Sequence, residues 1–358
     1  MKYLKPLLGA LALISTLAAC SPSAPNAQNP VAVTKTGDTY TVDMPLASFS
    51  DFIVIETQMG TQAPRIVSLD EAVAGLSAYD AIFVGEAHGH AASHYVQSKI
   101  FAGLHAGHKD MALSMEQFER SQQGVMDDYL AGKIGEETLI HDGKAWDHYR
   151  SSYRPLVEFA KNNGLPVIAA EVPANLVSCI GERGAQFLET LKPQPRAWAA
   201  RTLHLEDGAY KDKFYGFMQA AAGHRAGGDL SEAEKAQKRF RQFSAQASRD
   251  DTMAESIFDH MQAHPGRKIL HVNGSFHSAG LLGTPERVAL RAPNIAMANV
   301  HPILVDDPAA PSFDVDMASE GQYIVLLYPT PKRFVQMKNV NAFVARTKGK
   351  IDEKRCAY

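Results

Sequence analysis

Short apolar runs that stop at a glycine or an acidic residue recur along the chain, and they predict buried strands. Runs of this kind, bounded by polar residues, glycine or proline, are typical of strands buried on both faces of a parallel sheet. The clearest runs cover residues 80–86, 111–116, 167–171 and 268–274, and further strands are predicted at 40–44, 52–56 and 323–328.

Helical periodicity fills the intervals between these runs, with helices predicted at 90–106, 121–130, 155–162 and 252–264. Strands that alternate with helices predict an α/β fold with a mostly parallel sheet flanked by helices. Two stretches, 120–154 and 195–247, fit the alternation poorly. They are predicted to be helical insertions that cap one end of the sheet.

The N-terminal residues predict export and lipidation. Residues 1–19 form a basic start and an apolar run too short to span a bilayer, which is typical of a signal peptide. The run ends in Leu-Ala-Ala-Cys at Cys20, which resembles a bacterial lipobox and predicts an acylated Cys20. The alternative is a plain secretory signal. By the same resemblance, Ser21 after the cysteine favours the outer membrane, facing the periplasm.

The remaining chain is predicted to form one domain with two loose ends. Residues 20–38 are rich in Pro, Ser, Asn and Ala and predict a flexible tether. Residues 39–346 form the single α/β domain, and the charged segment 347–358 is predicted to be a loose tail. Cys179 and Cys356 could pair in an oxidising compartment, or both could remain free thiols.

Composition narrows the class of function. The 358 residues are 45% hydrophobic and 21% charged, which is ordinary for a soluble globular protein. The formal net charge is −3 and no basic stripe is present, which argues against a nucleic-acid partner.

Polar side chains gather where the predicted strands end. Because the carboxyl ends of parallel strands meet at one edge of a sheet, we expect a shared site there. Imidazoles and carboxylates suit a divalent transition metal, with Glu86, His88 and His277 as ligands. A buried hydrogen-bond network is the alternative. The polar residues at the four strand ends are Glu86, His88, Glu116, Glu171, Asn273 and His277.

An ordered set of motifs resembles a known family. The set is Gly85-Glu86-Ala87-His88 with His94, Glu116-Gln117-Phe118, Tyr153-Arg154-Pro155-Leu156, the segment 166–173, Asp251-Thr252-Met253-Ala254 and Gly274-Ser275-Phe276-His277. It is similar in order and spacing to ChaN-type lipoproteins, the haem-binding uptake branch of the Tiki superfamily, over residues 50–330.

The resemblance implies a lipoprotein of haem and iron acquisition, with haem held through tyrosine at a dimer interface. A binding protein is favoured over an enzyme, and its partner would be an outer-membrane haem receptor or a periplasmic haem carrier. Other relatives in the superfamily are metal-dependent peptidases and erythromycin-esterase-like hydrolases. The alternative function is therefore a metal-dependent hydrolase that uses Glu86, His88, Glu116 and His277.

One aromatic segment is the candidate haem contact. Trp146, Tyr149 and Tyr153 lie at i, i+3 and i+7, on one helical face, and Arg154 follows directly. A tyrosine oxygen suits ferric haem iron, and a nearby cation would favour the phenolate. With the resemblance, Tyr153, Tyr149, Arg154 and His94 are the predicted haem-binding residues. The alternative is an aromatic stripe packed on the sheet.

Overall fold

The computed structural model describes residues 32–222, 230–348 and 356. The predicted signal peptide and Cys20 lie outside this range. The described chain contains two sheets, whose strands are β1 (Val33–Thr36), β2 (Thr39–Val42), β3 (Phe52–Glu56), β4 (Arg65–Val67), β5 (Ala81–Glu86), β6 (Met111–Glu119), β7 (Val167–Glu171), β8 (Lys268–Gly274), β9 (Met297–Leu304), β10 (Ser312–Asp314) and β11 (Tyr323–Leu327).

The main sheet has eight strands in the order β4-β3-β11-β9-β5-β8-β6-β7. The six strands from β11 to β7 run parallel, and β3 and β4 add an antiparallel edge. The small sheet, β1-β2-β10, is antiparallel. The predicted α/β class with a mostly parallel sheet is therefore confirmed.

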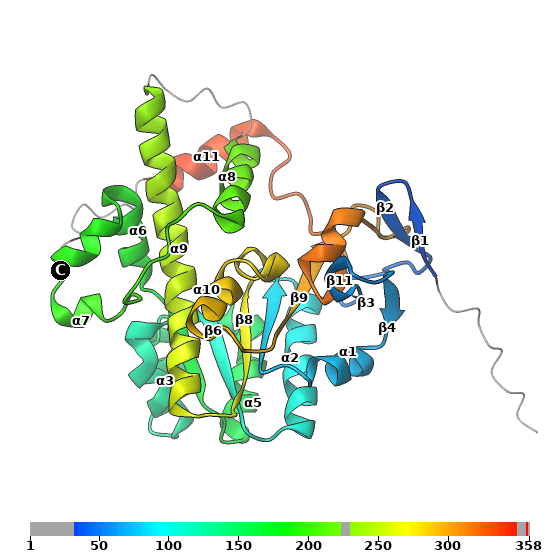
Figure 1. Ribbon diagram of the computed structural model, residues 1–358, viewed down its shortest axis with the longest axis horizontal. Coiled ribbons are helices and arrows are strands. Elements are labelled where there is room, and N and C mark those ends of the chain that lie inside the picture. The colour runs from blue at the N-terminus through cyan, green and yellow to red at the C-terminus, as the bar shows by residue number, and fades with distance from the viewer. Residues whose placement is uncertain (1–31, 223–229, 349–355, 357–358) are drawn as a thin grey trace, which may run out of the picture. The chain divides into compact units, whose positions relative to one another are not determined.

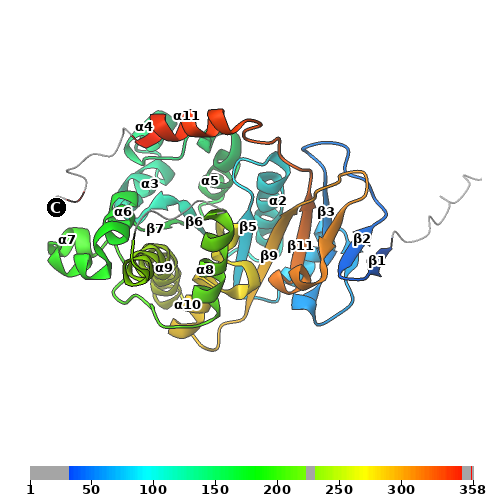
Figure 2. The same cartoon turned by 90° about the horizontal axis from the view of Figure 1, so that it is seen from above.

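Helices cover both faces of the main sheet, with α2 and α5 on one side and α9 and α10 on the other (Figures 1 and 2). The helices are α1 (Leu69–Leu76), α2 (Ala91–Gly107), α3 (Gln123–Leu130), α4 (Glu136–Asp142), α5 (Arg154–Asn162), α6 (Ala174–Arg183), α7 (Pro193–Arg196), α8 (Ala209–Ala222), α9 (Glu232–Ala263), α10 (Thr284–Arg291) and α11 (Met337–Lys348). Within the described residues, no helix is both long enough and apolar enough to cross a membrane.

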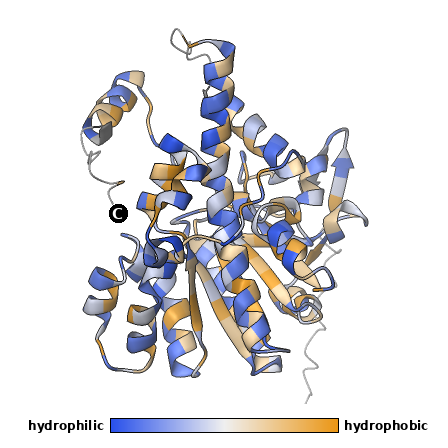
Figure 3. Cartoon of the chain, turned by 60° about the vertical axis from the view of Figure 1, so that its left-hand side comes forward, coloured by the Kyte–Doolittle hydropathy of each residue, from blue (hydrophilic) through white to orange (hydrophobic). Residues whose placement is uncertain are grey.

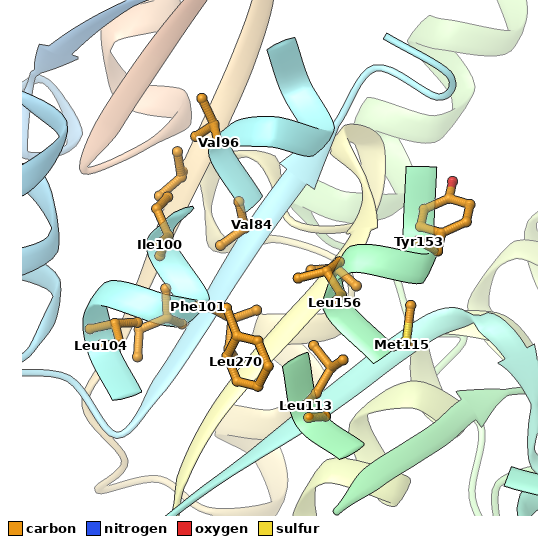
Figure 4. Packing of buried hydrophobic residues seen from close by; sticks show 14 of the residues in the cluster. Val84, Val96, Ile100, Phe101, Leu104, Leu113, Met115, Tyr153, Leu156 and Leu270 are labelled. Carbon is orange, nitrogen blue, oxygen red and sulfur yellow. The ribbon is translucent and has the colours of Figure 1, made fainter. Parts of the chain in front are cut away.

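Strand alternation divides the core into two layers. In β5, Ile82 and Val84 join the cluster beneath α2 and α5, whereas Ala81 and Phe83 join the cluster beneath α9 and α10. The pleat sends successive side chains to opposite faces, so a strand covered on both sides carries apolar residues at successive positions. Figure 3 shows the resulting contrast between apolar strands and helices of mixed polarity, and Figure 4 shows the first cluster from close by.

Some residues that the sequence places in the tether and the tail have regular structure. Residues 33–36 form β1, which pairs with β2 through a hairpin that turns at Gly37 with φ of +61°. At the other end, Thr347 and Lys348 belong to α11. Cys356 is buried and forms a disulfide with Cys179, with a Cα–Cα distance of 5.7 Å.

The segment 195–247 also differs from its prediction. It was predicted as two insertion helices separate from a helix over 252–264, but α9 is one helix of 32 residues. Its first half rises beyond the sheet beside α8 (Figure 1). Neither proline nor glycine interrupts residues 232–263, and Asp250 and Asp251 in the middle are buried. Their charges are paired by residues from other elements, so the polar stretch does not end the helix.

Candidate functional site

The ends of β5, β6 and β8 meet at Gly274. The Gly274 backbone nitrogen donates to Glu116 Oε2 at 2.5 Å. A β-carbon at position 274 would lie 2.8 Å from His88 Nε2, so only glycine allows the imidazole to approach. His277 Nε2 lies 3.7 Å from Glu116 Oε1. The structure thus brings Glu86, His88, Glu116 and His277 into one neighbourhood, and their functional roles remain predictions.

The site contains two hydrogen-bonded groups. Glu86, the last residue of β5, is the central acceptor of the first group, which also contains His88, Tyr153, Gln97 and Gln117. Its buried carboxylate accepts hydrogen bonds from His88 Nδ1 at 2.6 Å and from the Tyr153 hydroxyl at 2.6 Å. Gln97 and Gln117 donate their amide groups at 2.8 and 3.3 Å. A carboxylate can accept several hydrogen bonds at once, and these four donors compensate its burial.

His88 is the exposed member of this group. Its side chain is 47% exposed, and the ring of Trp146 lies edge-on at a centroid distance of 5.2 Å. Because Glu86 only accepts, the ring proton sits on Nδ1, and that hydrogen bond raises the pKa of His88. Among the described residues, Nε2 makes no hydrogen bond. His88 therefore offers one nitrogen to a ligand.

A second group forms around Asp250 in the middle of α9. Asp250 is fully buried and accepts from His277 Nδ1 at 2.8 Å and from Thr284 Oγ1 at 2.9 Å. The Tyr210 hydroxyl donates to its other oxygen at 2.5 Å. Burial alone would lower the pKa of His277, but the carboxylates of Asp250 and Glu116 outweigh burial and raise that pKa to about 9.

Arg249 joins the ends of β6 and β7. Its Nη2 lies 2.9 Å from Glu116 Oε1 and 2.8 Å from Glu171 Oε2. Burial raises the pKa of Glu171 to about 7, and Arg249 only partly opposes this rise. Burial acts in the same direction on Glu116, but His277 and Arg249 outweigh it, and the pKa of Glu116 falls. The two carboxyl groups therefore ionise in different pH ranges.

The Asp250–His277 pair predicts a pH dependence of stability. The folded protein raises the pKa of His277 from 6.5 to about 9. The resulting stabilisation is complete below about pH 6.5 and is lost as the pH rises through about 9. It amounts to on the order of 3 kcal/mol, because one pKa unit corresponds to about 1.4 kcal/mol.

Denaturant titrations of the wild type and of Asp250→Asn between pH 6 and 9.5 measure this effect. The asparagine keeps the size of the side chain but removes the charge, so most of the decline across this range should disappear. The raised pKa of Glu171 makes the stability of both proteins decline as the pH rises from about 4.5 to about 7, and this contribution is constant above about pH 7. An identical decline in the two proteins above pH 7 would contradict the prediction.

The predicted tyrosines lie inside the protein. Tyr149 and Tyr153 form a π-helical turn that continues into α5, and their exposed fractions are 1% and 0%. The ring of Tyr153 joins the core and its oxygen points away from the apolar cluster (Figure 4). Burial raises the pKa of both hydroxyl groups above the ordinary value. In this conformation neither oxygen is presented to a surface ligand.

The other predicted haem contacts are already paired. Arg154 makes hydrogen bonds of 2.5 and 2.8 Å to Glu136 in α4. His94 is buried, where its Nε2 accepts from the Gly89 backbone and its Nδ1 meets Gln97. Burial lowers the pKa of His94. Direct contact of either residue with haem stays a prediction.

The predicted metal centre is not supported by the geometry. Across the part of the chain that the structure describes, no group of three His, Cys, Asp or Glu side chains is placed to hold a metal ion. The physical reason is the division into two groups. Glu86 turns towards His88 and Tyr153, whereas His277 turns its Nδ1 to Asp250.

Sequence reasoning missed several residues of this site. Gln97, Arg249 and Asp250 were not singled out, and Gln117 appeared only as a member of a motif, although all four contact predicted residues. Gln117 follows Glu116 directly, and Arg249 and Asp250 adjoin the matched motif that starts at Asp251. The available signal was the acidic pair Asp250-Asp251 inside a predicted helical region. The sequence does not show that the pair is buried, because its partners, such as His277 and Thr284, lie far away in the chain.

Several aromatic pairs lie near residues that follow the strands. Phe276, next to His277, contacts Phe217 of α8 at a centroid distance of 5.2 Å, and Phe217 is 55% exposed. On another side, Phe49 packs against Tyr328 at 5.2 Å. Trp146, beside His88, adds a third aromatic side chain that contributes apolar surface.

A hollow of about 890 Å³ lies elsewhere, along the outer strand β7. Two ion pairs lie in its lining: Arg120 contacts Glu255, and Arg201 contacts Asp259. None of the strand-end residues described above lines it. The hollow is therefore separate from the site at Gly274.

Comparison with known proteins identifies relatives of the fold. Residues 72–288 match the family model described as "Haem-binding uptake, Tiki superfamily, ChaN". The fold is similar to ChaN of Campylobacter jejuni, a structure that describes cofacial haem binding, with a TM-score of 0.55 and 15% identity. That alignment covers 80% of this chain and all of the other.

More distant folds are also similar. An erythromycin esterase mutant in its open conformation has a TM-score of 0.46 and 11% identity, over 80% of this chain and 99% of that one. A protein of Bacillus cereus has a TM-score of 0.42 and 9% identity, over 78% and 95% of the two chains. No curated protein matches the sequence.

Proposed function

The chain belongs to the ChaN family of the Tiki superfamily, whose model covers residues 72–288, and from this we propose that it binds haem at the site around Gly274. The observation that carries the proposal is His88. Its imidazole is half-exposed, with Nδ1 held by Glu86 at 2.6 Å and Nε2 unbonded within the described residues. Histidine is a common axial ligand of haem iron.

The surrounding residues fit a haem group by their chemistry. Haem is a planar apolar macrocycle with an iron at its centre, so it needs aromatic surface and one donor atom. The rings of Trp146, Phe276 and Phe217 supply the surface, and His88 supplies the donor. When bound, haem contributes an iron that accepts this nitrogen. The chain's own part is to orient the imidazole and to cover the macrocycle.

This proposal replaces the tyrosine donor with a histidine donor. Tyr153 donates its hydroxyl to Glu86 and is buried, so ligation through its oxygen would need the surrounding helix to open. The aromatic segment still contributes, because Trp146 contacts the ring of His88. Tyr153 supports the donor residue through Glu86.

The proposal includes a location and partners. The lipobox at Cys20 supports an acylated protein at the outer membrane, facing the periplasm. There, haem would come from an outer-membrane receptor or pass to a periplasmic carrier. A second copy of the chain is the proposed partner in a haem-bridged dimer.

An absorption titration with haemin, beside a metal analysis of the same sample, tests the binding function. We expect a shifted Soret band that saturates at a fixed stoichiometry in the protein without residues 1–19. Light scattering at saturation tests the dimer. Stoichiometric zinc or manganese with no haem uptake would instead favour the hydrolase that uses Glu86, His88, Glu116 and His277.

A further inference from the structure

We propose that Glu86 tunes His88 into a strongly electron-donating ligand that favours ferric over ferrous haem, and that Tyr153 moderates this effect through its hydrogen bond to Glu86. The inference rests on the proposed haem function and assigns the residues that set the iron's preferred oxidation state. It gives Tyr153 a positioning role behind the donor.

The geometry forms a short chain of hydrogen bonds that ends at the exposed imidazole. His88 Nδ1 and the Tyr153 hydroxyl both donate to the same atom, Glu86 Oε1, each at 2.6 Å. The other oxygen, Oε2, accepts from Gln97 at 2.8 Å. His148 lies behind Tyr153, with its Nε2 3.3 Å from the hydroxyl.

Burial makes the central carboxylate effective. Glu86 is 2% exposed, so water does not weaken its hydrogen bonds as it would at the surface. A carboxylate that holds the second nitrogen of a ligating histidine fixes the ring orientation and raises the basicity of the donor nitrogen. A more basic nitrogen stabilises the ferric ion more than the ferrous ion, and such hydrogen bonds are a known control of haem potential.

Tyr153 acts on the same oxygen in the opposite sense. Its hydroxyl withdraws electron density from Oε1 and competes with His88 for that acceptor. Removing the hydroxyl should therefore strengthen the bond between Glu86 and His88. The arrangement predicts that changes at Glu86 and Tyr153 shift the ferric preference in opposite directions, which a merely structural role for both residues does not predict.

Spectroelectrochemical titration of the haem-loaded protein tests the proposal. In Glu86→Gln the ferric-over-ferrous preference should fall about tenfold or more, which raises the midpoint potential by about 59 mV per tenfold change. In Tyr153→Phe the potential should fall, by a smaller amount. Glu158→Gln is the matched control, because Glu158 also accepts a tyrosine hydroxyl, that of Tyr129, and it is expected to leave the potential unchanged.

The outcomes separate this inference from the function on which it rests. A wild type that takes up no haem contradicts the proposed function. A wild type that binds haem, with a potential that is unchanged in Glu86→Gln or that shifts the same way in both variants, overturns the inference alone. If Glu86→Gln does not fold, the sign of the shift in Tyr153→Phe decides: a fall supports the proposal, and no change or a rise overturns it.

Discussion

Replacing His88 by alanine is expected to abolish the shifted Soret band and to lower haemin affinity at least tenfold, about 1.4 kcal/mol. The reason is that His88 offers the half-exposed nitrogen of the strand-end group, while its neighbours His94 and His90 are buried. The fold should survive, because the His88 side chain is half-exposed and belongs to no buried apolar cluster of the described residues. Haemin titration and circular dichroism measure the two effects together.

His141→Ala is the matched control for this substitution. His141 is also an imidazole beside a carboxylate, Asp142 at 2.7 Å, but its side chain is 90% exposed and lies in α4. Its removal should leave haemin affinity and spectrum unchanged. Equal loss in both variants would show that haemin binds to surface histidines in general, which contradicts the site.

The sequence predicts a tyrosine ligand for the iron, whereas the proposal above names His88. The same haemin titration distinguishes the two ligands. If Tyr153 or Tyr149 holds the iron, the phenylalanine variant of that residue loses the charge-transfer band and most of the affinity, while His88→Ala keeps both. Phenylalanine retains the packing of the ring and removes only the oxygen. On the geometry described above, we expect both phenylalanine variants to retain haem.

Replacing Cys20 by serine is expected to move the protein from the membrane fraction to the soluble periplasmic fraction. Acyl chains on this cysteine would supply the anchoring free energy, and serine cannot carry the same thioether-linked lipid. The position lies outside the described residues, so the prediction rests on Leu17-Ala18-Ala19-Cys20 alone. Fractionation and immunoblotting of the full chain measure it.

Ser21→Asp provides the comparison, because it leaves the cysteine intact and changes only the residue after it. This variant should stay bound to membranes but move from the outer to the inner membrane in a density gradient. Membrane retention of Cys20→Ser would contradict lipidation. An unchanged gradient position of Ser21→Asp would contradict the outer-membrane assignment while leaving lipidation in place.

The amino-acid sequence alone determined the class of fold, because the signal for a buried strand is local. Residues 167–171 and 268–274 were predicted as strands and form β7 and β8 with those bounds. Both segments are rich in apolar residues and end at a glycine or an acidic residue, which is typical of a strand covered by helices on two faces. The same pattern predicts where the polar residues gather. Parallel strands have their carboxyl ends at one edge of the sheet, so the polar residues that follow these strands lie at that edge.

Only the tertiary structure decided which of these polar residues meet. Glu86 and Tyr153 are 67 residues apart, and Glu116 and the Gly274 nitrogen are 158 apart. No local pattern encodes such pairs. The same holds for α9, whose polar middle was predicted as a break between helices. The helix continues because Asp250 is paired with His277, Tyr210 and Thr284.

The roles of the tyrosines were also decided by packing. Spacing placed Trp146, Tyr149 and Tyr153 on one face, but spacing does not tell whether that face meets the core or the solvent. In the fold, Tyr149 and Tyr153 face the core beneath α2 and α5, and only the hydroxyl of Tyr153 reaches the polar site. An aromatic ring is stabilised by burial in proportion to its apolar area, so the folded chain buries both rings, whereas the His88 imidazole stays half-exposed.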